Sequence, residues 1–435
     1  MAAGKQEGGL YWRLSLMMFL EFAVWGAWSV MIATHMDHNL HFDGKHISYV
    51  FGTTAFGALL SPMIAGYIAD RVMPNQIFTA ISHLVGAALL FVAWKQTQFW
   101  PLEITMIAYA FTYMPTIALT NAIAFHHMKD SNKFGMIRMW GSIGWILVQM
   151  GLAAYLNHWR LLGGAAVESA HAADCFIFAA VAAVLMSVYC LTLPNTPPSK
   201  NAKNPYAFLE ALKLARNRNF LILLVISFIV AIELPFYYNL TLLYLTEPMK
   251  LGGVGLTLDR GQFVMTYGQI GEIAMMALLY PLMRKGGVKW TIFLGILAWP
   301  VRYAIFAYLH QYPSIVVAAL PLHGICYAFF FAGGMMAVER IAHRDIRASA
   351  QGLMVFATNG LGMLVGHFVS GRVHDFYRTA EGGHNWAGIF MIPIVVTVVA
   401  GIIFLLAFNE KQFSADSAKV KAEDAALEAT PVPAA

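Results

Sequence analysis

The chain has few charged residues for its length. Of its 435 residues, 12% are charged and 59% are hydrophobic. Soluble domains carry about 25% charged residues, and a soluble chain of this length normally forms two or three domains with wide polar surfaces. The composition therefore excludes an ordinary soluble protein and favours lipid as the surrounding solvent. The net charge of +5 is scattered over short loops and forms no basic stripe, so we expect no nucleic-acid partner.

Cysteine and catalytic motifs are also scarce. The three cysteines, Cys175, Cys190 and Cys326, lie in apolar runs without metal or redox spacing, so we interpret them as small apolar side chains. The sequence has no Walker A loop, no H-E-x-x-H and no G-x-S-x-G, so neither ATP-driven transport nor the commonest hydrolase chemistries have support. We expect no enzyme activity, no cofactor and no metal. The first apolar run, Leu14 to Ile32, is too long for a cleaved signal peptide and predicts a spanning helix.

What the chain does have is long apolar runs. Twelve of them lie between residues 12 and 408, each near the length of about 17–25 residues that a spanning helix needs. We predict an all-α polytopic membrane protein with twelve transmembrane helices in two six-helix bundles, 1–194 and 219–408. A polar loop at 195–218 joins the bundles, and the Ala-, Lys-, Glu- and Pro-rich tail at 409–435 is predicted to be disordered. Such a two-fold repeat is typical of transporters with a site between the halves.

The distribution of Lys and Arg over the loops predicts the orientation. With the N-terminus in the cytoplasm, 20 of the 28 basic residues lie on the cytoplasmic side, seven lie outside and Arg302 lies within a span. Because cytoplasmic loops are enriched in Lys and Arg, we expect both termini in the cytoplasm.

Four ionisable residues stand out inside predicted spans: Glu21, Glu233, Glu272 and Arg302. A charge at mid-bilayer costs about 2.5–3.5 kcal/mol on insertion scales, so such residues usually face a wet pathway. Desolvation disfavours the carboxylate anion, which suits the three glutamates to taking up and releasing protons. The alternative is structural ion pairing, with Arg302 or Arg138 as the cation.

Two predicted helices each carry a polar face. Arg138, Ser142 and Trp145 follow one another at steps of four and three, and Gln269 and Glu272 are three apart. These steps place the members of each set on one face of a helix. A cation, a hydroxyl, an indole and two polar chains make a good wall for a flat polar ligand.

The seventh predicted helix adds Tyr237, Tyr238 and Asn239 directly after Pro235, where we expect a kink. Helix packing and interfacial aromatic belts are the alternative explanation for these aromatics, although they do not explain Gln and Glu within a span.

Two further signals have simpler interpretations. The first loop is rich in His and holds His38 and Asp43 at an acyltransferase-like H-x4-D spacing, but a solvated loop explains it better than a metal site or an enzyme. Gly362 and Gly366 form G-x-x-x-G, which predicts a close helix contact.

The stretch from Gly66 through Asp70 to Arg71 resembles the G-x-x-x-D-R signature of the major facilitator superfamily, which implies that these three residues help to gate the two halves. Other stretches resemble the nucleoside:proton symporter family over nearly the whole chain. They are Tyr113-Met-Pro-Thr116 with Asn121, Ile137-Arg-Met-Trp-Gly-Ser-Ile-Gly144, Gln269-Ile-Gly-Glu272, Ala298-Trp-Pro-Val-Arg302, and Ile346-Arg-Ala-Ser-Ala-Gln-Gly352 with Thr358-Asn-Gly360.

The resemblance implies that the two polar faces contact substrate, with Arg138 and Ser142 as donors, Trp145 as an aromatic face, and Gln269 and Glu272 addressing hydroxyls or base edges. Tyr238, Asn239 and Tyr327 complete our set of candidate substrate contacts.

The chain departs from the family at two places. Pro235 and Tyr238 stand where the seventh helix of the family is polar, and Ala328 follows Tyr327 where related permeases carry an acidic residue. Glu21 is our candidate replacement for the missing carboxylate.

The resulting hypothesis is a monomeric carrier of the bacterial inner membrane that takes up nucleosides with protons by alternating access. Glu272 is the first candidate for proton coupling, followed by Glu21 and Glu233, and Arg302 is assigned a structural charge. The alternatives are a symporter of the same fold for a sugar or another polar metabolite, a membrane-bound enzyme, and a sensor that binds without transporting.

Overall fold

The computed structural model describes residues 2–71, 73–128, 134–198, 213–343 and 346–429. Over these ranges the chain is helical, and its only β interaction is an isolated bridge between Arg378 and His384. The helices of the first half are α1 (Ala2–Ser29), α2 (Met31–Thr34), α3 (Gly44–Arg71), α4 (Asn75–Trp94), α5 (Phe99–His127), α6 (Phe134–Ala170) and α7 (Cys175–Cys190).

The second half continues the same architecture. Its helices are α9 (Arg218–Ala231), α10 (Leu234–Thr246), α11 (Leu258–Tyr308), α12 (Pro313–Ala319), α13 (Leu322–Ile325), α14 (Gly333–Ile341), α15 (Arg347–Val355), α16 (Met363–Phe376), α17 (Trp386–Ala407) and α18 (Glu410–Ala429). Three π-helical segments, which often occur at functional sites, are η1 (His35–Asn39), η6 (Cys326–Ala332) and η7 (Phe356–Gly362).

Nine helical stretches within the described ranges are long and apolar enough to span a membrane. Two of them, Phe134–Cys190 and Leu258–Tyr308, are 57 and 51 residues long, well beyond the roughly 20 residues that one crossing needs. Each is interrupted by a glycine with positive φ, Gly164 at 78° and Gly287 at 81°, where the chain reverses between helices. The protein is therefore a multi-pass membrane protein.

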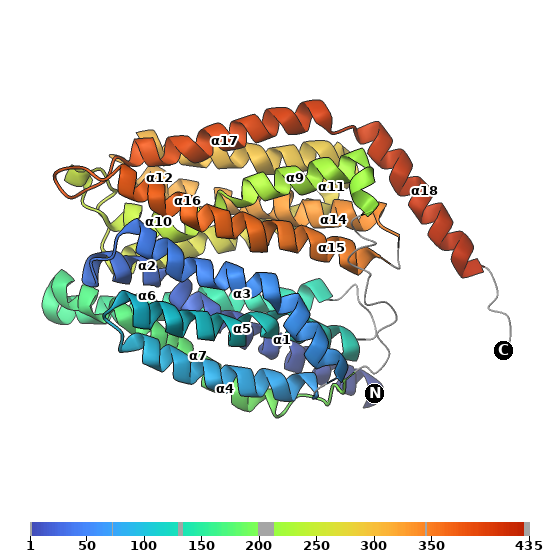
Figure 1. The fold of residues 1–435 in the computed structure, drawn as a ribbon, viewed down its shortest axis with the longest axis horizontal. Helices are drawn as coiled ribbons and strands as arrows, with labels where there is room; N and C mark the ends of the chain where they lie inside the picture. Colours follow the sequence, from blue (N-terminus) through green and yellow to red (C-terminus); the bar gives the residue numbers. More distant parts are fainter. Residues whose placement is uncertain (1, 72, 129–133, 199–212, 344–345, 430–435) are drawn as a thin grey trace.

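The helices form two bundles that lie against each other (Figure 1). The first contains α1 to α7 and the second contains α9 to α17, with contacts between them mainly from α3 to α16 and from α6 to α11. Both chain ends lie at the same end of the bundles, and α18 extends away from them there (Figure 1). At the opposite end, a Cβ at Gly371 would collide with the Gly44 carbonyl oxygen, so α3 and α16 approach backbone to backbone.

The predicted kink at Pro235 is confirmed. Helix α9 ends at Ala231, α10 begins at Leu234 with Pro235 in its first turn, and Glu233 occupies the N-cap between them. The close contact predicted for the G-x-x-x-G pair is also present, since a Cβ at Gly362 would meet Ala231 and a Cβ at Gly366 would meet the Ile232 carbonyl. The broken helix and η7–α16 therefore pack tightly together.

The C-terminal tail differs from our prediction of disorder, because residues 410–429 form helix α18. The Glu410 carboxylate accepts hydrogen bonds from the backbone N–H groups of Val288 (3.1 Å) and Lys289 (2.7 Å). Farther along the helix, Asp424 contacts Arg347 at 3.2 Å. Tail composition alone did not reveal these partners, which lie far away in the sequence.

Candidate substrate and proton site

The candidate site lies where α6 of the first bundle faces the second bundle. Arg138 and Trp145, on one face of α6 as their spacing predicted, are both half-buried. The Arg138 guanidinium lies over the Phe22 ring of α1, 3.7 Å from its centroid, and the Trp145 indole packs edge-on against Trp25 at 5.6 Å. Helix α1 therefore holds the polar face of α6 in place. Ser142, one turn from Arg138, is also half-buried.

The facing wall comes from the second bundle. Glu272 on α11, Tyr238 on α10 and Tyr327 on η6 are half-buried, and Gln269 on α11 is buried. The Arg138 guanidinium is close enough to Glu272 and Tyr327 for their charges to interact, and Tyr238 is similarly close to both. A cation of one bundle thus faces a carboxylate of the other.

Several polar groups at this site have no partner within the described part of the chain. Trp145 Nε1 and Gln269 Oε1 are buried and make no hydrogen bond. Arg138 and Glu272 make no hydrogen bond or ion pair with a described residue, although their charges interact. Buried polar groups are nearly always satisfied in native structures, so the two buried groups without a partner, beside the half-buried Arg138 and Glu272, favour a site for a polar ligand at this interface.

Asn239 does not join this group. Its side-chain amide donates to His367 Nδ1 at 3.0 Å and to Ser370 Oγ at 3.2 Å, which directs it toward α16. Its position on α10, one residue after Tyr238, turns it to another face of the helix.

Glu21 is fully buried inside the first bundle. One carboxylate oxygen is 2.9 Å from His83 Nε2, and the other accepts a hydrogen bond from Thr116 Oγ1 at 2.7 Å. The Tyr113 hydroxyl donates to the Glu21 backbone carbonyl at 2.8 Å. The carboxylate is therefore fully satisfied by protein groups.

Arg302 is also fully buried, but it forms no ion pair with a carboxylate of the described residues. Its Nη1 lies 3.1 Å from His323 Nδ1, and its guanidinium lies over the rings of Tyr237 (4.4 Å), Trp299 (4.7 Å) and Tyr303 (4.9 Å). Cation–π contacts in a desolvated setting can each contribute about 2 kcal/mol. Aromatic rings thus take the place of the ion pair that we considered for this residue.

Glu233 is buried at the break between α9 and α10, and its Oε2 atom has no partner among the described residues. Its backbone carbonyl accepts a hydrogen bond from Tyr303 at 3.1 Å. The carboxylate therefore lies in the second bundle at the one place where the seventh span loses its regular hydrogen bonds.

The predicted gating residues Gly66, Asp70 and Arg71 lie in the last turns of α3, but their side chains are outside the described part of the structure. At the opposite end of α3, Asp375 of α16 accepts hydrogen bonds from the backbone N–H groups of Gly44 (2.6 Å) and Lys45 (2.9 Å).

A second polar contact between the bundles lies at that same end. Arg160 of α6 pairs with Asp259 of α11 at 3.2 Å, and the Asp259 backbone N–H donates to Glu168 at 2.6 Å. Polar contacts therefore join the two bundles at the end opposite the termini.

The His-rich loop does not form the catalytic pair that its spacing suggested. Asp43 lies 2.6 Å from His46, whereas His38 lies 3.6 Å from Asp37. Among the residues described, no group of three or more His, Cys, Asp or Glu could hold a metal ion.

Sequence reasoning missed three residues around the site. Phe22 and Trp25 support Arg138 and Trp145, and their spacing of three on α1 was a visible signal of a shared face. His323 packs between Tyr237 (4.3 Å, stacked) and Tyr238 (5.9 Å, edge-on), and no spacing along the chain indicated this.

Comparison with known proteins agrees with this geometry. The family described as "Nucleoside H+ symporter" matches residues 9–413. The chain belongs to this family. It is 33% identical to the putative nucleoside transporter YegT of Escherichia coli K12, over 95% of this chain and 97% of that protein. It is 28% identical to the nucleoside permease NupG of the same organism, over 92% of this chain and 96% of the permease.

The fold is likewise that of a solved family member. A crystal structure of a mutant of the nucleoside transporter NupG superimposes with a TM-score of 0.81 at 27% identity, covering 92% of this chain and all of that one. Since the family consists of transporters, the expectation that the chain is not an enzyme is confirmed, and the enzyme alternative built on His38 and Asp43 is set aside.

Proposed function

We propose that this protein carries nucleosides together with protons into a bacterial cell by alternating access of its two bundles. The observation that carries the proposal is a set of polar groups divided between α6 and α11 that have no partner among the described residues: Arg138, Trp145, Gln269 and Glu272, of which Trp145 Nε1 and Gln269 Oε1 are buried. A ligand that satisfies both helices binds to both bundles at once, which is what coupling of binding to rocking requires.

A nucleoside suits this set chemically. Its base is flat and can stack on Trp145, whose indole is already fixed by Trp25. Its ribose hydroxyls and base edge offer donors and acceptors to Gln269, Glu272 and Arg138. Tyr238 and Tyr327 close the site from the second bundle, with Ser142 as a further donor on α6.

Proton coupling is assigned first to Glu272. While it is ionised it faces Arg138 across the interface, and protonation removes that attraction. Proton uptake therefore changes the free energy of one arrangement of the bundles relative to the other. Because the substrate contacts the same two residues, its binding affinity changes as well. Glu233 and Glu21 follow as candidates. Glu21 ranks lower now that its carboxylate is satisfied within one bundle by His83 and Thr116.

We further propose twelve crossings. They are the nine candidate spans, with the two longest counted as two crossings each at Gly164 and Gly287, and helix α3 as the remaining one. The excess of Lys and Arg at the end that carries the termini supports placing this end in the cytoplasm of a bacterial inner membrane. Asp375 and Asp259 then belong to an external gate and Gly66, Asp70 and Arg71 to an internal one. We propose that the carrier acts as a monomer.

The test is uptake of labelled uridine and adenosine by proteoliposomes, with and without an inward proton gradient. We expect uptake to rise with the gradient and to collapse when a protonophore is added. Folded protein that takes up neither compound under a gradient contradicts the proposal.

A same-fold carrier for another polar metabolite is the second candidate function, because Ala328 and Pro235 depart from the family pattern. Competition of uridine uptake by sugars, free bases and modified nucleosides separates the two. Stronger inhibition by a sugar than by unlabelled uridine favours the second candidate.

A further inference from the structure

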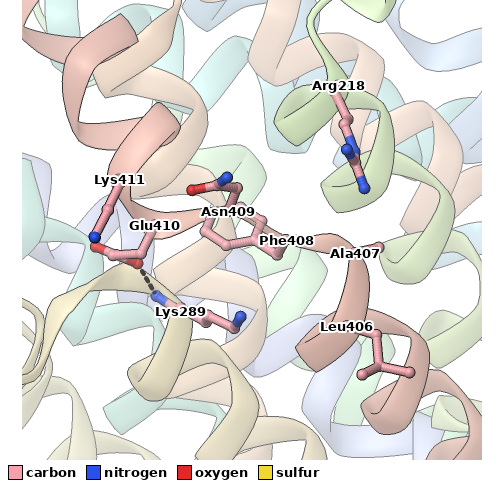
Figure 2. A pocket seen from close by; sticks show the side chains of 8 residues that line it. All are labelled: Arg218, Lys289, Leu406, Ala407, Phe408, Asn409, Glu410 and Lys411. Carbon is pink, nitrogen blue, oxygen red and sulfur yellow. Dashed lines mark hydrogen bonds between the residues drawn. The ribbon is translucent and has the colours of Figure 1, made fainter.

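A second polar hollow lies far from the substrate site, at the end of the bundles that carries the termini. We call it the basic groove (Figure 2). It encloses about 610 Å³, including space open to the surroundings, and is lined by Arg218, Lys289, Leu406, Ala407, Phe408, Asn409, Glu410 and Lys411. It thus combines three cations from three different segments with the apolar end of α17.

The charges of this groove are unbalanced. Arg218, Lys289 and Lys411 make no ion pair with any residue that the structure describes. The single acidic side chain, Glu410, is already engaged, because its two oxygens accept the backbone N–H groups of Val288 and Lys289. Three cations against one hydrogen-bonded carboxylate leave a net positive site.

Hydrogen bonds hold the backbone segments that carry the three cations. The Asn409 backbone N–H donates to Asn219 Oδ1 at 3.0 Å, and Asn219 Nδ2 donates back to the Asn409 carbonyl at 3.1 Å. Arg218 directly precedes Asn219, and Lys411 directly follows Glu410, whose carboxylate binds the backbone beside Lys289. Such pre-positioning lowers the entropy lost when a ligand is bound.

Apolar side chains at the groove and beside it indicate that the groove lies at the membrane surface. Leu406 is 82% exposed and ends a stripe of exposed apolar side chains along α17, formed by Val395, Val399, Ile402 and Leu406 at helical steps. Trp290, next to Lys289, is 56% exposed, as is typical of indoles at the headgroup level. The groove therefore lies at the border between hydrocarbon and headgroups.

We propose that the basic groove binds the phosphate of an anionic phospholipid, of the phosphatidylglycerol class, from the leaflet on the side of the termini. The positive charge of Arg218, Lys289 and Lys411 attracts the headgroup phosphate into the groove, and an acyl chain lies along the α17 stripe. Basic pockets at this level of cytoplasmic leaflets recognise anionic headgroups. The bound lipid anchors three segments to the bilayer. They are the start of α9, the part of α11 that follows Gly287, and the junction of α17 and α18.

Native mass spectrometry of the full-length protein in mild detergent tests the proposal, with phosphatidylglycerol and phosphatidylcholine of identical acyl chains offered in equal amounts. We expect phosphatidylglycerol to be preferred by about fivefold or more, as charge complementarity requires. The triple variant Arg218→Gln, Lys289→Gln, Lys411→Gln should lose this preference. A charge-conserving variant, Arg218→Lys with Lys411→Arg, should keep it and shows that the site tolerates substitution.

The matched control removes three other cations at the same end, Arg284→Gln, Lys285→Gln and Lys421→Gln, none of which lines the groove. It should retain the preference. Equal loss in both triple variants would show a diffuse attraction instead of a site, and no preference in the unaltered protein would also overturn the proposal. Displacement of phosphatidylglycerol by millimolar inorganic phosphate would assign the groove to a soluble anion.

Discussion

At the scale of single residues, we propose that nucleoside recognition depends most on Trp145. Its ring is fixed by Trp25 and its Nε1 atom has no partner among the described residues, so one side chain offers both a stacking face and a donor. Arg138 and Glu272 supply charge, but charge does not discriminate a base from a sugar. Trp145 therefore carries the preference for a flat ring.

Replacing Trp145 by Ala should weaken uridine binding about 5- to 160-fold, because stacking of a base on an aromatic ring contributes roughly 1–3 kcal/mol. Trp145→Phe keeps a ring and should lose much less. Equilibrium binding of labelled uridine to purified protein measures both, with Trp100→Ala, a 69% exposed indole, as the control. Equal affinities of the Ala and Phe variants would show that the ring does not stack on substrate.

The environment of Glu21 favours a structural role. Thr116→Val removes one hydrogen bond to its buried carboxylate and should cost roughly 1–3 kcal/mol of folding free energy. Thr112→Val is the matched control, since Thr112 on the same helix bonds only to the local Tyr109 carbonyl. Thermal unfolding should show a larger loss for Thr116→Val, with the proton dependence of uptake unchanged. Unchanged stability together with altered proton dependence would instead make Glu21 a coupling residue.

At the scale of helices, we propose that the contact between the N-terminus of α3 and the C-terminal end of α16 closes one end of the protein. Asp375 places its carboxylate on the backbone N–H groups of Gly44 and Lys45, where a helix N-terminus favours negative charge. The close approach of Gly44 and Gly371 lets the two helices meet. Both features act only while this end is closed.

Asp375→Asn should therefore favour opening at this end. The free-energy difference between the closed and the open arrangement should fall by roughly 1–2 kcal/mol, the contribution of a charge-assisted contact. Spin labels at Trp100→Cys and Phe376→Cys, exposed by 69% and 79%, report the separation by pulsed electron resonance. We expect a larger population of long distances. Gly371→Ala, which inserts a Cβ between the helices, should act in the same direction.

The control is Asp174→Asn. Asp174 lies at the same end, but its described partners, Trp94, Tyr155 and His171, all belong to the first bundle. With the same two spin labels, the distance distribution of the Asp174→Asn variant should match that of the unaltered protein. If Asp375→Asn also leaves the distribution unchanged, the contact does not hold the gate.

Sequence reasoning succeeded where the information is local to a helix. The step from Arg138 to Trp145 predicted a shared face, and Pro235 predicted the break before α10. It could not find contacts between distant segments. His83 and Thr116 are 62 and 95 residues from Glu21, and no helical period links them. Folding of α18 was missed for the same reason, because Glu410 is satisfied by backbone 122 residues earlier.

At the scale of the whole molecule, the two bundles have different interiors. The first buries a carboxylate with His83, and the second buries the Arg302 guanidinium among aromatic rings. Each charge makes its contacts inside its own bundle, so neither contact needs to change as the bundles rock. Arg138 and Glu272 instead face each other across the interface, and their interaction must change with each cycle. This difference is why we assign proton coupling to the interface.

The measurement that tests this assignment most directly is proton current on a solid-supported membrane when uridine is added without a preset gradient. The unaltered protein should give an inward current that saturates with uridine. Glu272→Gln should give no current and still exchange labelled for unlabelled uridine, because the mutant binds and rocks but carries no proton. A uridine-dependent proton current from Glu272→Gln would contradict the account and move the coupling site elsewhere, with Glu233 the next residue to test.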